Sequence, residues 1–311
     1  MDRERVIRAS VIVCTRDRRD RLGACLAALA AQDDLPEGGF EVLIVDNGSQ
    51  DDTAAVVAGF VAAAPDRFRY LSAPLPGKSR ALNHALARAA GEYLLFTDDD
   101  CIAAPDWVRC AIAELDEDPA IGVLGGRIEL HDPRDMAVTI RTGRERVELA
   151  STAQLFFFVA GCNMVIRRRV VDRVGPFDVL LGPGSQRGAG AEDVDYVYRA
   201  FRCGERVVYS PRPCVRHAHG RRSYDQLAAL ERSYVEGRGA FYAKHIVGGD
   251  AAILRMAYWE LRGCVARAVQ RPLAAARLRD EWRLIRQLLR GAWQRLVDVL
   301  CRRHGNARQL R

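Results

Sequence analysis

The sequence predicts an α/β fold in which flanking helices cover a Rossmann-like, mixed and mostly parallel sheet. Through the first hundred of its 311 residues, short β-branched apolar runs alternate with apolar residues at helical spacing. This alternation is typical of parallel strands joined by helices and covered on both faces. Beyond Tyr224 the apolar spacing is mainly helical, so the sequence also predicts a helical C-terminal extension.

Four strands are expected in the first hundred residues, at 11–14, 42–45, 68–71 and 93–97. Helical spacing predicts helices around 22–29, after a cap at Asp51 or Asp52, and over 79–90. Ligands bind at the carboxyl ends of such strands. Polar clusters stand at three of these ends, and we expect them to line one cleft: Thr15-Arg16, Asp46-Asn47 and Asp98-Asp99-Asp100.

The middle of the chain, from about 121 to 190, is less regular and ends in a glycine-rich loop over 182–190. A helix is expected from about Glu192 to Gly204 and a short strand at 206–209. An apolar stripe with arginines mostly beside it marks the last helix: Trp282, Ile285, Leu289, Trp293, Leu296 and Leu300.

We expect one domain over 1–222, divided at about 130, and a basic helical extension over 223–311. The net charge of +7 is uneven, because residues 251–311 hold 14 basic and 4 acidic side chains, a net charge of +10. The remaining 33 basic and 36 acidic residues give a net charge of −3. A basic extension on a near-neutral body predicts contact with an anionic membrane or partner and no nucleic-acid ligand.

The nine cysteines are odd in number, scattered and never spaced C-x-x-C, so they do not form a disulfide framework. This pattern predicts a cytoplasmic protein, and the basic extension adds a place at the inner face of the membrane. Apolar runs of the roughly 20 residues needed to cross a bilayer are absent from the sequence.

Three consecutive carboxylates, Asp98, Asp99 and Asp100, follow the fourth predicted strand. Their mutual repulsion is offset directly by a bound hard cation such as Mn²⁺ or Mg²⁺. If strand geometry continues, Asp98 and Asp100 point to one side and share the metal. The alternative is a solvated turn that caps the next helix.

Other polar residues each allow a functional and a structural interpretation. Glu192 and Asp193 open a predicted helix, where a carboxylate acts either as a cap or as a general base. His217 is either a metal ligand or a surface or structural residue. Lys78 either reaches a diphosphate or lies in solvent, and its Gly77-Lys78-Ser79 setting lacks the spacing of a Walker A loop.

Taken in order, these segments resemble the family 2 glycosyltransferases of GT-A fold over about residues 9–245. The resemblance rests on eight motifs, VIVCTR (11–16), VDNGS (45–49), GKSRALN (77–83), FTDDDC (96–101), GCNM (161–164), GPFD (175–178), AEDVD (191–195) and VRH (215–217). It implies a nucleotide-sugar-dependent, inverting enzyme whose donor is linked to UDP, dTDP or GDP. In its catalytic domain over 1–222, residues to about 130 would form the nucleotide-sugar-binding half and residues 131–222 the acceptor half.

The resemblance also implies roles for single residues. Thr15, Arg16, Asp46, Lys78, Asp98 and Asp99 would bind the nucleotide sugar. Asp100, Asp98 and His217 would hold a divalent metal, and Asp193, with Glu192 beside it, would be the catalytic base. Gly161, Cys162 and Asn163 would lie near the donor sugar and acceptor.

Two departures from the family pattern matter. Leu82 replaces an arginine that many relatives carry, which leaves Lys78 or Arg80 to supply that charge. A Gln-x-x-Arg-Trp motif of processive synthases is absent, which favours transfer of a single sugar. The alternatives are a sugar-phosphate nucleotidyltransferase, which usually needs a glycine-rich loop after the first strand, and a non-catalytic protein that binds an anionic surface.

Overall fold

The computed structural model describes residues 6–33, 38–185, 190–270 and 275–309, with secondary structure alone at 268–270, 275–279 and 301–309. It separates into two compact units, and each is described by itself. Unit 1 comprises residues up to Phe177 and Asp193–Ser223, and unit 2 comprises Asp178–Glu192 and the residues from Tyr224. The predicted domain boundary at 222 stays a prediction, and residues 186–189 of the predicted glycine-rich loop lie outside the described residues.

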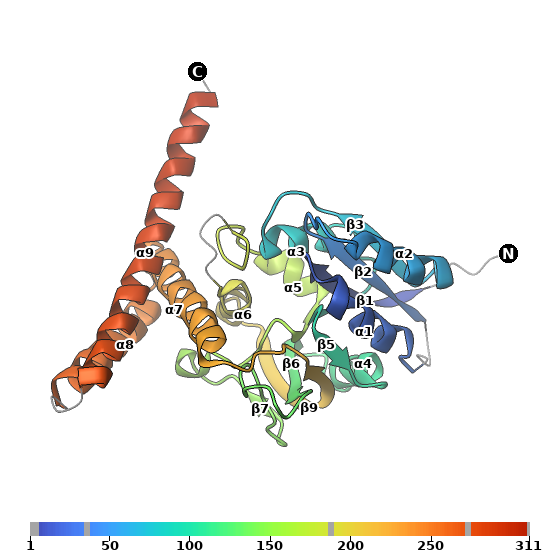
Figure 1. Cartoon of the computed structure of the whole chain (residues 1–311), viewed down its shortest axis with the longest axis horizontal. Helices are drawn as coiled ribbons and strands as arrows, with labels where there is room; N and C mark the ends of the chain where they lie inside the picture. Colours follow the sequence, from blue (N-terminus) through green and yellow to red (C-terminus); the bar gives the residue numbers. More distant parts are fainter. Residues whose placement is uncertain (1–5, 34–37, 186–189, 271–274, 310–311) are drawn as a thin grey trace. The chain divides into compact units, whose positions relative to one another are not determined.

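Four parallel strands of unit 1 bring their carboxyl ends to one edge of the sheet, in the order β3-β2-β1-β4 (Figure 1). The register pairs Thr15 with Asp46 and Cys14 with Asp98, so the polar ends of three strands lie side by side. These strands are β1 (Ile7–Thr15), β2 (Gly39–Asp46), β3 (Phe68–Ser72) and β4 (Tyr93–Asp98). The four strands that the sequence predicts in the first hundred residues are confirmed.

Helices cover both faces of this sheet, which explains why its strands are apolar without interruption. Val11 and Val13 point into the core that α1 and α4 complete, whereas Ile12, equally buried, points to the other face. On that second face Phe96 packs against Phe177. The helices of unit 1 are α1 (Arg19–Ala30), α2 (Thr53–Ala63), α3 (Lys78–Leu86), α4 (Trp107–Glu117), α5 (Arg168–Val174) and α6 (Glu192–Arg202, whose first residue belongs to unit 2), with a short 3₁₀ turn at Thr152–Gln154.

The second half of the sheet is mixed. Strand β8 runs antiparallel between β4 and β6, and β9 is parallel to β6 but antiparallel to β5 and β7. Their bounds are β5 (Cys101–Ala103), β6 (Ile121–Leu130), β7 (Val147–Glu148), β8 (Asn163–Arg167) and β9 (Arg206–His217). The predicted mixed α/β class is therefore confirmed.

The middle of the chain is more regular than the sequence predicts. Strand β6 contains Gly125 and Gly126, which interrupt the apolar pattern that marks a strand. A Cβ atom at Gly125 would press on Val159, and one at Gly126 would overlap with Asn163. Glycine is needed at both positions because neighbouring segments pack directly on the strand. The same glycines interrupt the run of apolar residues by which a strand is recognised in the sequence, so β6 was not predicted.

Strand β9 continues past the predicted end at 209 to His217, through Pro211 and Pro213. Its register against β6 shifts between Gly125 and Arg127, and this irregularity accommodates residues that cannot donate a ladder hydrogen bond. His217 is thus the last residue of a long strand and not part of a loop after a short one.

Unit 2 consists of residues 178–192 and three helices, α7 (Tyr224–Val247), α8 (Ala251–Gln270) and α9 (Ala275–Gln309). Asp178 accepts ion pairs from Lys244 of α7 and Arg295 of α9, at 2.9 and 2.8 Å. Within the described residues, no helix is long and apolar enough to cross a membrane.

Candidate functional site

Asp98, Asp99 and Asp100 contact three different partners. Strand β4 ends at Asp98 and the chain turns over Asp99 and Asp100, so the expected continuation of strand geometry is wrong. The turn is imposed because Cys101 begins β5, which pairs with β9 rather than with a neighbour of β4. The three carboxylates therefore point in different directions.

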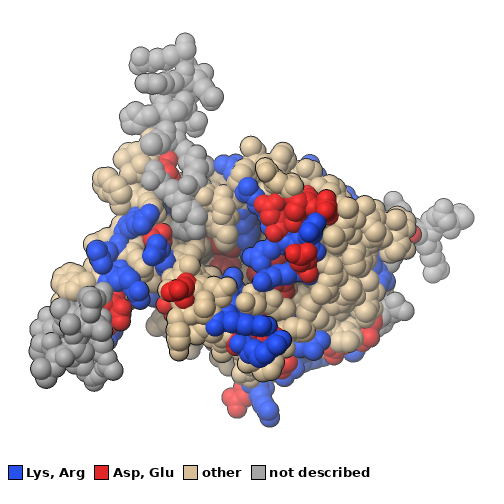
Figure 2. All heavy atoms as spheres, in the orientation of Figure 1, with Lys and Arg blue, Asp and Glu red and all other residues tan. Residues whose placement is uncertain are grey.

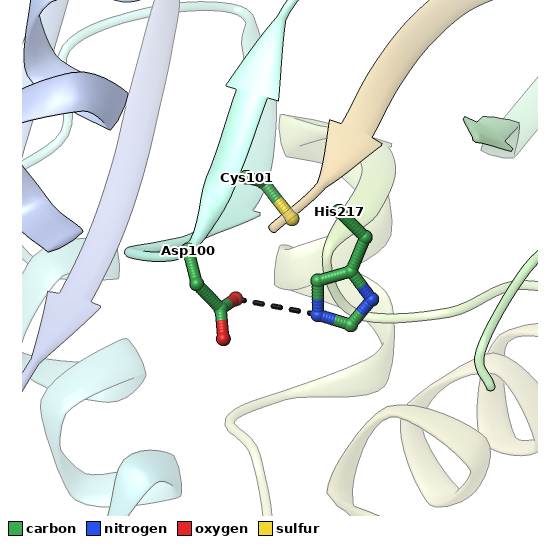
Figure 3. A group of neighbouring side chains, drawn as sticks. All are labelled: Asp100, Cys101 and His217. Atoms are coloured by element: carbon green, nitrogen blue, oxygen red, sulfur yellow. Dashed lines mark ion pairs between the residues drawn. The ribbon is translucent and has the colours of Figure 1, made fainter. Parts of the chain in front are cut away.

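Asp100 faces His217. Cys101 and His217 are register partners of β5 and β9, which places Asp100 Oδ1 3.3 Å from His217 Nε2 (Figure 3). Burial alone raises the pKa of Asp100, but the hydrogen bond and charge of His217, with Arg18 and Arg221 nearby, lower it to about 2. The buried Nδ1 of His217 has no hydrogen-bond partner among the described residues.

Asp99 turns inward, toward β1. Its Oδ2 accepts a hydrogen bond of 2.7 Å from the Thr15 hydroxyl. Burial is the main reason that the pKa of Asp99 rises to about 6, and the neighbouring carboxylates add to it. Thr15, expected in the nucleotide pocket, therefore holds the acidic turn in place through Asp99.

Asp98 pairs with Lys78, whose Nζ lies 2.7 Å from Asp98 Oδ1. Lys78 is the first residue of α3, and Gly77 before it has a φ of +129°, a conformation that glycine tolerates. The Asn47 carboxamide fixes this turn, because its oxygen accepts the Gly77 N–H at 2.8 Å. Lys78 is thus fixed at the same edge as the acidic turn.

Asp46, at the end of β2, is buried beside these residues. Its carboxylate accepts hydrogen bonds of 2.8 Å from the Ser49 N–H and from the Tyr70 hydroxyl. Burial and the bond to Asp46 raise the pKa of Tyr70 to about 12. Arg16, by contrast, is well exposed and lies 3.5 Å from Asp17.

A metal could be held by Asp100 and His217, which with Cys101 offer ligand atoms within 4.8 Å of one another. The Cys101 thiol is buried against that of Cys162, and this hydrogen bond and burial raise its pKa well above the usual value. A protonated thiol is a poor ligand for a hard cation, which takes oxygen and nitrogen. Asp98, expected as a third ligand, lies outside this group.

Asp193, the candidate base, is hydrogen-bonded to Gly161, and Gly161 lies at the same edge of the sheet as the acidic turn. Asp193 Oδ2 accepts the Gly161 N–H at 2.8 Å, and its Oδ1 accepts the N–H of Val194 at 2.7 Å. Gly161 precedes β8, whose register pairs Asn163 with Thr97 just before the acidic turn. The Cys101–Cys162 contact confirms that 161–162 lies next to 99–101. Asp193 is therefore close to the acidic turn.

Asn163, expected near the donor sugar and acceptor, has its side chain in the core of unit 1. It is 0% exposed, its carbonyl oxygen accepts the Trp107 indole N–H at 2.9 Å, and its amide donates to the carbonyls of Arg127 and Pro213 at 2.8 and 3.1 Å. With these bonds its carboxamide is engaged inside unit 1, so only Gly161 and Cys162 of that segment lie at the edge. Glu192, the first residue of α6, is buried and belongs to unit 2.

Two residues that support the site, Arg21 and Asp135, were not predicted as site residues. Arg21 of α1 donates to the His219 carbonyl at 2.6 Å and lies 3.7 Å from Asp100. Asp135 accepts the Gly220 N–H at 2.9 Å, which holds the segment after His217 in place. Arg21 and Asp135 stand in no motif, and only folding reveals them.

The chain matches the model of glycosyl transferase family 2 over residues 10–175, and that of glycosyl transferase family group 2 over 93–297. Among curated relatives, glycosyltransferase AglE of Haloferax volcanii is 26% identical over 74% of this chain and 72% of its own. An N-acetylglucosaminyltransferase of Mesorhizobium japonicum is 27% identical over 65% of this chain, which spans about half (49%) of that relative.

Solved structures share the fold. A mannosyltransferase of Pyrobaculum calidifontis, in complex with GDP-Man and Mn²⁺, superposes with a TM-score of 0.63 at 22% identity, covering 94% of this chain and 87% of its own. TarS of S. aureus with UDP-GlcNAc gives a TM-score of 0.59 at 23% identity, over 76% of this chain and 66% of its own. With its GT-A fold and the family model matched over more than half of its length, the chain belongs to glycosyl transferase family 2 and is a glycosyltransferase.

Proposed function

We propose that the protein moves a single sugar from a nucleoside-diphosphate sugar to an acceptor hydroxyl, with inversion at the anomeric carbon and Asp193 as general base. One observation carries the proposal: the Asp193 carboxylate, the acidic turn and Lys78 lie at one edge of the sheet of unit 1. A base, a cation and a candidate metal site are the groups that this displacement needs.

Asp193 supports the role of base through its geometry. One N–H from Gly161 and one from Val194 hold its carboxylate in a fixed orientation. Because each carboxylate oxygen has further lone pairs, an acceptor hydroxyl can still donate to it. The proton of the acceptor would pass to Asp193 as the new glycosidic bond forms and the bond to the diphosphate breaks.

Asp100 and His217 support a divalent metal, Mn²⁺ or Mg²⁺. Asp100 Oδ1 and His217 Nε2 already face one another at 3.3 Å, so a carboxylate oxygen and an imidazole nitrogen would be available to one cation. When bound, such a cation would stabilise negative charge on the leaving diphosphate. Lys78 would supply positive charge to the same group, and Asp46 would bind the base of the nucleotide.

A screen of donors tests this proposal. UDP-, dTDP- and GDP-sugars should be added to the protein with Mn²⁺, with Mg²⁺ or with a chelator, and the melting temperature measured. We expect one donor class to stabilise the protein only when a metal is present. Equal melting temperatures with and without metal for every donor would contradict the metal-assisted donor site.

The products then distinguish the reaction. Transfer releases a nucleoside diphosphate, whereas a nucleotidyltransferase would release pyrophosphate, and nuclear magnetic resonance of the product gives the anomeric configuration. A product with retained configuration would contradict the role of Asp193.

The cytoplasmic location predicted from the cysteines stays a prediction. The membrane contact of the C-terminal helices also stays a prediction, and it is separate from the transfer chemistry.

A further inference from the structure

Helix α9 of unit 2 exposes large apolar side chains in a single stripe. Trp282, Leu289 and Trp293 follow one another at i, i+7 and i+11, and they are 50%, 56% and 67% exposed. Ile285, which the sequence places in the same apolar stripe, and Leu288 next to it are buried. Packing within unit 2 therefore covers only part of the apolar face of α9 and leaves the aromatic part exposed.

Helix α8 repeats the arrangement. Leu254, Tyr258 and Val265 lie at i, i+4 and i+11, and each is about half exposed. The buried side chains Ile253, Ala257 and Cys264 occupy another side of the helix. We call the exposed apolar residues of both helices, together with Trp259, the aromatic stripes. Exposed apolar groups repeated in this way mark an interaction surface.

Arginines stand beside the aromatic stripes. Arg255, Arg262 and Arg286 are exposed, and among the described side chains none of them has a carboxylate within ion-pair distance. The Arg262 guanidinium lies 4.9 Å from the centre of the Trp259 ring. Figure 2 shows basic side chains gathered over the C-terminal helices. This surface is thus apolar and positively charged at once.

We propose that the aromatic stripes and their arginines dock the protein on an anionic lipid bilayer. Tryptophan and tyrosine partition to the level of the lipid headgroups, and arginine can place its alkyl part among the lipids while its charge reaches phosphate. A second copy of the chain would bring like charges together at these arginines. The net charge of +10 over 251–311 has its complement in an anionic bilayer.

Vesicle co-sedimentation of the full chain tests the proposal without any sugar transfer, so its failure would leave the proposed reaction untouched. We expect binding to vesicles of phosphatidylcholine with phosphatidylglycerol, weaker binding as salt rises, and little binding to phosphatidylcholine alone. Equal binding to both vesicle types, or no binding to either, would overturn the proposal.

Two variants locate the surface. Trp282→Ala with Trp293→Ala should lower the partition coefficient on the order of tenfold. Separately, Arg255→Gln with Arg262→Gln and Arg286→Gln should lower it roughly 100-fold. The matched controls are Tyr224→Ala, an aromatic that is 82% exposed at the start of α7, and Arg134→Gln, exposed on unit 1. Circular dichroism confirms that each variant folds.

Self-association is the competing result. If light scattering found a dimer that becomes a monomer in the Trp282→Ala, Trp293→Ala variant, while anionic vesicles bound neither protein, the stripes would be an interface between two copies. If the variants bound vesicles as the parent does, the surface assignment would be wrong.

Discussion

At the scale of single residues, the three carboxylates of the acidic run have different partners. Lys78 holds Asp98, Thr15 holds Asp99, and His217 holds Asp100, each through one contact of 2.7 to 3.3 Å. The environments differ enough to raise the pKa of Asp99 to about 6 and to lower that of Asp100 to about 2. Neighbours in sequence thus become chemically distinct groups because each faces a different strand or helix.

Replacing the candidate base tests the assignment of Asp193. Asp193→Asn keeps the shape of the side chain but removes its basicity, so we expect kcat to fall by about 10²–10⁴-fold while donor binding is retained. Rates should be measured at saturating donor and acceptor. Asp66→Asn, at an exposed position between α2 and β3, is the matched control. Glu192→Gln separates the two acidic residues, since a loss confined to that variant would move the role of base to Glu192.

Replacing the candidate metal ligand gives a second prediction. Asp100→Asn should weaken metal-dependent binding of a nucleoside diphosphate on the order of 100-fold, because a charged ligand is lost. Titration calorimetry with and without Mn²⁺ measures this effect. Metal-dependent affinity equal to that of the parent protein would place the cation elsewhere.

At the scale of elements, close packing fixes how neighbouring segments meet. Helices α7 and α9 cross through glycines, since a Cβ atom at Gly239 would overlap with the backbone of Leu288 and one at Gly291 with that of Glu236. In unit 1, Asn163 ties β8 to α4, β6 and β9 through its three hydrogen bonds. The helix crossing therefore has no room for a Cβ atom at Gly239 or Gly291, and the site of Asn163 requires a carboxamide.

The helix crossing predicts an unusual cost for alanine. Gly291→Ala should destabilise unit 2 by roughly 1–3 kcal/mol or more, because the two backbones must separate to admit a methyl group. Gly59→Ala in α2, where a Cβ would meet nothing within 4 Å, should stabilise by up to about 1 kcal/mol. Urea denaturation compares the two, and similar effects of both changes would contradict the close crossing.

The carboxamide of Asn163 gives a matching prediction for unit 1. Asn163→Ala leaves the Trp107 N–H and two carbonyls buried without partners, and each such group costs about 1–3 kcal/mol. We expect a loss of at least about 3 kcal/mol in the free energy of unfolding, measured by urea denaturation. If stability were unchanged but turnover fell, the side chain would serve the sugar site instead.

At the scale of the whole molecule, the partly buried carboxylate of Asp178 pairs with two of the long C-terminal helices. Partial burial raises the pKa of Asp178, but Arg295 and Lys244 outweigh burial and lower the pKa below its usual value. Its folded-state pKa is depressed, so its contribution to stability is present above the unfolded pKa of about 4 and is lost as the pH falls below it.

Acid should therefore loosen unit 2 through Asp178. The melting temperature of the parent protein should begin to fall near pH 4 and continue to fall as the pH approaches the lowered folded-state pKa, and Asp178→Asn should lower it at pH 7 while flattening this dependence. Thermal unfolding followed by circular dichroism across this range measures both effects. A variant with the slope of the parent protein would show that other carboxylates control acid unfolding.

The sequence by itself determined the four parallel strands, the helical C-terminal region and the family, because continuous apolar runs, helical spacing and ordered motifs are local signals. It did not reveal β6, β8 or the length of β9, whose glycines, prolines and polar residues serve contacts far away in the chain. It could not separate the roles of Asp98, Asp99 and Asp100, because their partners come from α3, β1 and β9. Only the tertiary structure decided these, since a charge or hydrogen bond acts through distance in space and not through position in the chain.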